Sequence, residues 1–79
     1  MAVKYHTLKK IYTILNDCFP TLATLKEKTD LSQTAIFNIM TRMKIAGIIK
    51  MVNIDEQNCY SLKPISFKDF VILCYEKGV

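Results

Sequence analysis

Residues 21–62 read TLATLKEKTDLSQTAIFNIMTRMKIAGIIKMVNIDEQNCYSL, and the order of structural signals within this stretch decides the fold. A short helix, a tight turn, a longer helix and a β-hairpin are predicted to follow one another without a linker. The residues on either side of the stretch are expected to add one helix each. The sequence therefore predicts a single α+β domain over residues 1–79, in the order helix, helix, helix, strand, strand, helix.

The longer of the two central helices is predicted between Ser32 and Ala46. The hydroxyl of Ser32 can accept a hydrogen bond from a free amide of the first turn, and Leu31 is placed to pack against Ile36. Gly47 ends the helix, because glycine readily adopts the left-handed conformation found past a helix end. At about 100° per residue, one side collects Ile36, Ile39, Met40 and Met43, and the other side collects Thr34, Phe37, Asn38 and Thr41. One side is therefore expected to pack and the other to stay free.

The shorter central helix is predicted from Leu22 to Lys28, with Thr21 as its cap. The three residues 29–31 then form a turn into the Ser32 helix. Two helices joined by a turn of this length form the helix-turn-helix arrangement of DNA-binding proteins, here over about residues 21–46.

A β-hairpin is predicted over about residues 48–63. The first strand is rich in β-branched residues, and residues 60–63 are expected to return as the second strand. Tyr60 is at an alternating position and is expected to pack the hairpin against the core. The expected tip is Asp55-Glu56-Gln57-Asn58, which contains two acids and no glycine.

The two flanking helices differ in character. The first, from about Tyr5 to Cys18, repeats apolar residues at helical spacing. The last, over about residues 66–77, begins with a capping box formed by Ser66 and Asp69. Residues 70–75 are apolar on all sides, which indicates that a second surface covers this helix. A strand, or a helix wholly buried within one chain, is the alternative for so short a run.

Composition and charge limit the class of protein. Seventy-nine residues form one small domain with a marginal core, which favours oligomerisation. No apolar run is long enough to span a membrane and residues 1–6 lack the apolar stretch of a signal peptide, so a cytoplasmic protein is expected. Residues 1–50 carry eight basic and three acidic groups, whereas residues 51–79 carry three and four. The positive charge thus lies on the helix-turn-helix half, where it attracts phosphates or forms a solvated surface.

No residue pattern indicates catalysis or a cofactor. The sequence pairs no nucleophile with a base and has neither a glycine-rich phosphate loop nor an acidic cluster, so no enzyme activity, metal or small-molecule substrate is expected. Cys18, Cys59 and Cys74 are odd in number and lack metal-binding spacing. Two interpretations stay open for them: reduced thiols, or a disulfide between the Cys74 residues of two subunits.

The stretches LKEKTDLSQTAI (residues 25–36) and MKIAGIIK (residues 43–50) resemble winged helix-turn-helix regulators of bacteria and archaea. The similarity is to the MarR, ArsR and PadR types and to small regulators of archaeal viruses and plasmids. YSLK (residues 60–63) is similar to the returning strand of their wing. The resemblance implies a winged helix-turn-helix fold, with the Ser32 helix as recognition helix in the major groove. It also implies a homodimer formed through the last helix, by Phe70, Leu73, Cys74 and Tyr75.

Two sets of side chains are the candidates for DNA contact. The first combines hydrogen-bonding groups that suit base edges with a ring that suits a thymine methyl: Gln33, Thr34, Phe37, Asn38 and Thr41. The second consists of cations expected to meet phosphates: Lys26, Lys28, Arg42, Lys44, Lys50 and Lys63. The acidic tip is expected to avoid the DNA backbone, to accept from a cytosine amino group or to contact protein.

The sequence therefore predicts a homodimeric regulator that binds double-stranded DNA sequence-specifically, with repression as the expected outcome. The alternative is a winged-helix module that docks on a protein of a transcription or replication complex, because a fold does not by itself fix a function. An effector-sensing regulator is a third option, for which no pocket chemistry is visible.

Overall fold

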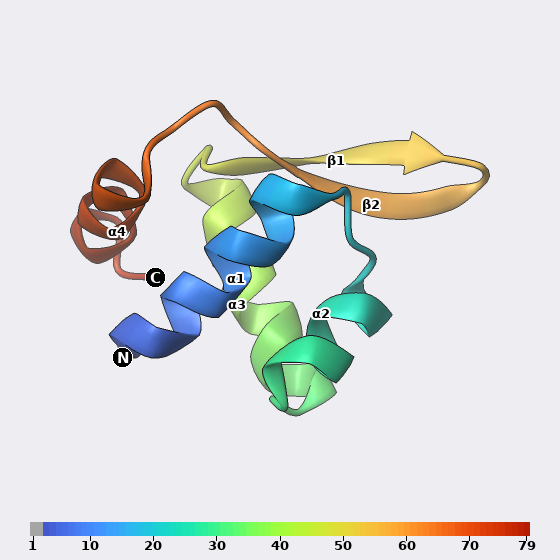
Figure 1. Cartoon of the computed structure of the whole chain (residues 1–79), viewed down its shortest axis with the longest axis horizontal. Helices are drawn as coiled ribbons and strands as arrows, with labels where there is room; N and C mark the ends of the chain where they lie inside the picture. The colour runs from blue at the N-terminus through green and yellow to red at the C-terminus, as the bar shows by residue number, and fades with distance from the viewer. Residues whose placement is uncertain (1–2) are drawn as a thin grey trace.

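Figure 1 shows the computed structural model, which describes residues 3–79 as four helices and one antiparallel hairpin. In chain order the elements are α1 (Tyr5–Asp17), α2 (Leu22–Thr29), α3 (Gln33–Ile45), β1 (Ile49–Ile54), β2 (Gln57–Leu62) and α4 (Phe67–Glu76). The predicted α+β order of three helices, two strands and a helix is confirmed. None of the described helices is both long and apolar enough to cross a membrane.

The two central helices begin at the predicted caps. The Thr24 amide donates to the Thr21 hydroxyl at 3.2 Å, and the Ala35 amide donates to the Ser32 hydroxyl at 3.1 Å. Each bond satisfies an amide that has no partner within its own helix. Between the helices, Asp30 takes the left-handed conformation with a φ of 59°, and the chain turns sharply into α3.

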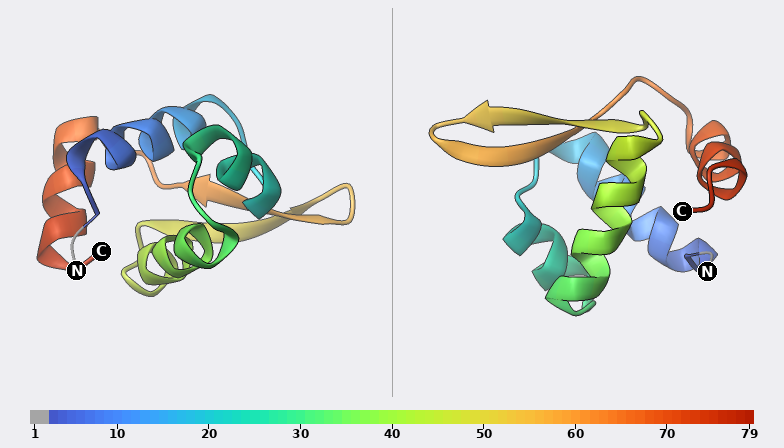
Figure 2. Two further views of the ribbon diagram at one scale, coloured as in Figure 1. Left: turned by 90° about the horizontal axis from the view of Figure 1, so that it is seen from below. Right: turned by 180° about the vertical axis from the view of Figure 1, so that it is seen from behind.

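One core joins all four helices to the hairpin. α1 packs against α2, α4 and β2, while α3 packs against α2 and β1. Seen from below, α1 and α3 lie on opposite sides of the molecule (Figure 2). The largest fully buried side chains are Phe70, Leu8, Ile11, Leu25, Ile36, Met40, Met43 and Ile48. The apolar stripes that the helical spacing predicts for α1 and α3 therefore meet in this core.

β1 and β2 form a hairpin that extends away from the helices (Figure 1). Ile54 pairs with Gln57, so the turn consists of Asp55 and Glu56 alone. The predicted four-residue tip is thus wrong in length, because the strand pairing already includes Gln57 and Asn58.

The hairpin is attached to the rest of the chain at its base. Tyr60 is buried, as predicted, and its amide donates to the Pro20 carbonyl at 2.9 Å. The Lys63 amide donates to the Ile48 carbonyl at 3.2 Å and continues the pairing beyond the ends of both strands. The bond to Pro20 holds β2 against the segment that connects α1 with α2.

α4 is held at both ends. At its start the Asp69 amide donates to the Ser66 hydroxyl at 3.2 Å, which confirms Ser66 as the cap of this helix. After the helix, the Val79 amide donates to the Cys74 carbonyl at 2.9 Å, and the Val79 side chain is fully buried. The Val3 amide donates to the Val79 carbonyl at 3.2 Å, so the two ends of the described chain lie together.

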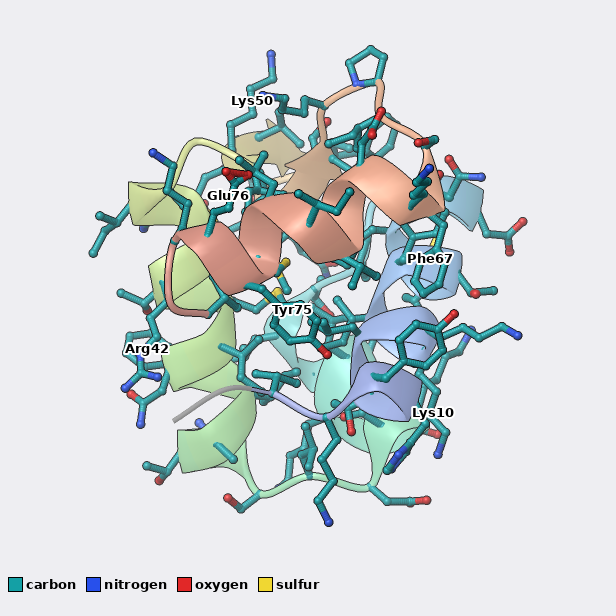
Figure 3. All side chains as sticks on the ribbon, turned by 90° about the vertical axis from the view of Figure 1, so that its left-hand side faces the viewer. Lys10, Arg42, Lys50, Phe67, Tyr75 and Glu76 are labelled. Atoms are coloured by element: carbon teal, nitrogen blue, oxygen red, sulfur yellow. The ribbon has the colours of Figure 1, made fainter. Side chains whose placement is uncertain are left out.

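Two of the four residues predicted for the dimer interface lie on the inner face of α4. Phe70 and Cys74 are fully buried within the single chain and pack into its core. They are four residues apart and share one side of the helix, which packs against α1. The Cys74 thiol is buried in this structure, so it is not accessible for a disulfide with a second chain in this conformation. The other two predicted interface residues are more open: Leu73 is half-buried, and Tyr75, labelled in Figure 3, is 48% exposed.

Candidate nucleic-acid interface

α3 presents its polar side to solvent on the side of the molecule away from α1 (Figure 2). Gln33, Thr34 and Asn38 are exposed on it, and the Phe37 ring is 52% exposed. Thr41 is half-buried. The structure thus brings the five predicted base-facing side chains to the solvent side of one helix. We refer to this surface, residues 33, 34, 37, 38 and 41, as the outer face of α3.

The rotation of α3 about its axis is set by its buried side. Ile36, Met40 and Met43 are fully buried and lie three or four residues apart, so they form one stripe along the helix. Packing this stripe into the core turns the opposite side outward. The cap at Ser32 holds the first turn, from which Gln33 and Thr34 project.

Four of the predicted phosphate-binding cations lie on α3, on β1, which packs against it, or on the side of α2 that shares a hollow with Gln33. Arg42 and Lys44 are exposed on α3 itself, and Lys50 is exposed on the adjoining strand β1. Lys26 of α2 lines a shallow hollow together with Gln33. Cations placed on several elements around a helix attract phosphates and hold that helix in position on a duplex.

The other two predicted cations lie elsewhere. Lys28 comes two positions after Lys26 and is therefore turned by about 200° around α2. It lines a different hollow, together with Lys9 and Lys10 of α1. Lys63 lines a hollow with residues 15–19, at the end of α1. The structure therefore does not bring Lys28 and Lys63 together with the outer face of α3.

Ile45 is a surface residue that sequence reasoning missed. Its side chain is 80% exposed at the C-terminal end of α3. It follows Thr41 by four positions and Asn38 by seven, so it extends the outer face of α3 by one turn. The same helical spacing that selected Asn38 and Thr41 was the signal that could have found it. With Phe37, it gives this face two apolar contact points.

The tip of the hairpin carries negative charge. Asp55 and Glu56 are exposed, with φ of 50° and 65°. A two-residue hairpin turn in which both central residues have positive φ is a type I′ turn. Two carboxylates at this position repel a phosphate backbone, so the tip is not suited to bind one.

Within residues 3–79, no three His, Cys, Asp or Glu side chains are grouped so that they could hold a metal ion. Cys18 is exposed, whereas Cys59 and Cys74 are buried. Burial raises the pKa of the Cys74 thiol to about 11 and also raises the pKa of the Tyr60 hydroxyl. Both groups are therefore neutral near pH 7 and act as core residues.

The chain matches no protein family, no curated protein and no solved structure. Its function is therefore inferred from the outer face of α3 and the charges around it.

Proposed function

We propose that this protein is a sequence-specific regulator that binds double-stranded DNA through the outer face of α3, as winged helix-turn-helix proteins do. The observation that carries the proposal is the row of exposed hydrogen-bonding side chains on α3, namely Gln33, Thr34 and Asn38. Asparagine and glutamine can each bind adenine with two hydrogen bonds, and an exposed Phe37 can contact a thymine methyl. Sites that contain A·T pairs are therefore the expected targets.

The dimensions and surroundings of α3 support this proposal. α3 has 13 residues. A helix with its side chains is about 10–12 Å across, close to the roughly 12 Å width of the major groove. Four exposed cations on α3 and on the elements packed against it could pair with phosphates beside the groove: Lys26, Arg42, Lys44 and Lys50. In this arrangement the hairpin acts as the wing, and its acidic tip stays away from the backbone.

A homodimer is part of the same proposal. The outer side of α4 exposes Ile72 (45%) and Tyr75 (48%), whereas the half-buried Leu73 is turned by about 200° from Tyr75. Pairing of two copies through this side would bury apolar surface that water now contacts. A two-fold dimer would then bind a palindromic site with half-sites about one helical turn apart. We further propose that the dimer represses transcription by occupying such a site. We expect the protein to act in the cytoplasm.

A second candidate function is docking on another protein through the same outer face of α3. Phe37 (52% exposed) and Ile45 (80% exposed) favour it, because large exposed apolar side chains on one face are typical of protein interfaces. The acidic hairpin tip is also compatible with a protein partner.

Fluorescence anisotropy of labelled duplexes, titrated with salt, tests the two candidates. The duplexes are a random pool, a G·C-only duplex and the DNA upstream of the protein's own gene. For DNA regulation we expect affinity to fall steeply with salt, and one sequence to bind about a thousandfold more tightly than the random pool. Asn38→Ala should reduce this preference, while Lys10→Ala on α1 should not. Failure of all three duplexes to bind at low salt would favour protein docking.

A further inference from the structure

α1 and α2 form the sides of an open hollow that the proposed DNA interface does not use. It has a volume of about 470 Å³ and is lined by His6, Lys9, Lys10, Thr13, Ile14 and Lys28. We refer to it as the α1–α2 hollow. No acidic residue in the described part of the chain lines it. The hollow therefore combines several positive charges without a negative one.

The surface inside the hollow is nonetheless mostly carbon. Ile14 is half-buried and packs against the core, so only part of its side chain is covered. The Thr13 hydroxyl donates to the Lys9 carbonyl at 2.8 Å, which occupies its hydrogen within α1. The lysines contribute the methylene groups of their side chains and extend their ammonium groups into water. The result is an apolar floor with a cationic rim.

The α1–α2 hollow faces away from the proposed DNA interface. α1 and α3 lie on opposite sides of the molecule in the view from below (Figure 2). Lys10 on α1 and Arg42 on α3 likewise project from opposite sides (Figure 3). A duplex bound along the outer face of α3 therefore does not reach Lys9 or Lys10. The cations of the hollow are available to another partner.

We propose that the α1–α2 hollow binds an acidic, amphipathic segment of a partner protein. An apolar side chain of that segment covers the floor at Ile14, and flanking carboxylates pair with Lys9, Lys10 and Lys28. Burial of apolar surface supplies most of the affinity, because exposed ion pairs contribute little. The rim selects acidic segments over basic ones. This interaction goes beyond the proposed function and does not depend on whether α3 binds DNA.

The floor favours a protein segment over a nucleic-acid backbone. Phosphates and sugars pair with cations but offer no aliphatic side chain to cover Ile14. When only charged groups bind above such a carbon surface, the surface stays in contact with water. The hydrophobic effect then adds nothing to the affinity. A peptide with both carboxylates and Leu or Phe matches both parts of the hollow.

The test uses the isotope-labelled full chain and a short fluorescent peptide composed of Asp, Glu, Leu and Phe. Binding should shift the backbone amide resonances of Lys9, Thr13 and Lys28 and leave those of Gln33 and Asn38 in place. A first matched peptide has Asn and Gln in place of its acids, and a second has Ser in place of Leu and Phe. Both should bind at least about tenfold more weakly, since one lacks the charges and the other the apolar contact.

Charge variants on the two sides of the molecule locate the site. Lys9→Ala combined with Lys10→Ala should weaken peptide binding about fivefold, because two exposed ion pairs are lost. Arg42→Ala combined with Lys44→Ala removes the same charge from α3 and should leave binding unchanged. Equal binding of the serine peptide, or resonance shifts confined to α3, would overturn the proposal. Duplex DNA that shifts the Lys9 and Lys28 resonances where the peptide does not would also overturn it, by identifying a nucleic-acid surface.

Discussion

The Tyr12 hydroxyl, in α1, donates a hydrogen bond of 2.7 Å to the backbone carbonyl of Ile65, 53 residues later in the chain. Ile65 lies in the segment between β2 and α4, so this bond joins the first helix to the connection that leads into the last. The Tyr12 ring also packs against Phe67 and Phe70, with centroid distances of 5.3 and 5.2 Å. Tyr12 therefore positions the start of α4 by both a polar and an aromatic contact.

Tyr12→Phe should lower the free energy of unfolding by about 1 kcal/mol, because the substitution keeps the ring and leaves the Ile65 carbonyl without its donor. Urea denaturation followed by circular dichroism measures this. Tyr5→Phe is the matched control: the Tyr5 ring also packs on Phe67, but its side chain is 56% exposed and water can replace its partners. Equal stability of the two variants would show that the bond to Ile65 contributes nothing.

Glu56→Gly should stabilise the fold by roughly 0.5 kcal/mol. Glu56 has a φ of 65°, where a side chain costs about 1–2 kcal/mol, and part of the gain is offset by the greater freedom of glycine in the unfolded chain. The midpoint of thermal unfolding should rise accordingly. Glu56→Ala removes the same charge but keeps the strain, so it should show no such rise. A similar increase for both variants would assign the effect to charge.

The free energy of unfolding should fall as the pH rises from about 9 to about 11, and Cys74 should account for part of this decrease. Burial raises the pKa of this thiol from an ordinary 9.0 to about 11. Below pH 9 the thiol is protonated in the folded and the unfolded chain alike. Between about pH 9 and pH 11 only the unfolded chain loses the proton, which favours unfolding. Urea denaturation across this range should give a shallower pH dependence for Cys74→Ala. An unchanged slope would contradict a buried neutral thiol.

Exposed and buried thiols should also react at different rates. Cys18 is exposed, whereas Cys59 and Cys74 are buried, so one thiol per chain should react rapidly with a chromogenic disulfide reagent under native conditions. The other two should react when urea unfolds the chain. Cys18→Ser should abolish the rapid phase. Rapid reaction of all three thiols would show that the core opens readily.

Two substitutions on α3 should have different effects if the protein reads DNA as proposed. Asn38→Ala should reduce discrimination between matched and mismatched sites by about 1–3 kcal/mol, because a base contact is lost. Arg42→Ala should weaken all duplexes alike and reduce the slope of log affinity against log salt by about one. Anisotropy titrations at several salt concentrations separate these outcomes. Identical effects of both substitutions would contradict a division into base and phosphate contacts.

The acidic tip offers a further test of the proposed DNA complex. Asp55→Asn combined with Glu56→Gln removes two negative charges and keeps the side-chain size. Duplex affinity should stay the same or increase, since carboxylates near phosphates are repulsive. Anisotropy at low salt detects the change, and Asp69→Asn combined with Glu76→Gln on α4 removes the same two charges as a control. Marked weakening would indicate that the tip accepts hydrogen bonds from bases.

Local signals predicted most of the fold correctly. Thr21, Ser32 and Ser66 each cap the helix that was expected after them, because a cap needs only a hydroxyl and an amide three residues later. The free side of α3 was also predictable, since its apolar stripe of Ile36, Met40 and Met43 leaves only one way to rotate the helix.

Predictions were less accurate where a local pattern left several arrangements open. Residues 70–75 are apolar on all sides of α4, so their spacing did not indicate that Phe70 and Cys74 would be the inner residues. Lys26 and Lys28 lie on different sides of α2 by their spacing alone, but the burial of Leu25 decides which of them faces α3. In both cases the rotation of a helix depends on the neighbour against which it packs.

The sequence by itself determined the order of the elements, the caps and the side of α3 that meets water. Each of these depends on groups within one or two helical turns of each other. Only the tertiary structure decided which residues of α4 enter the core, that Lys28 joins Lys9 and Lys10, and that Tyr60 is bonded to Pro20. These features join segments far apart in the chain, so they follow from the simultaneous packing of several elements around one core.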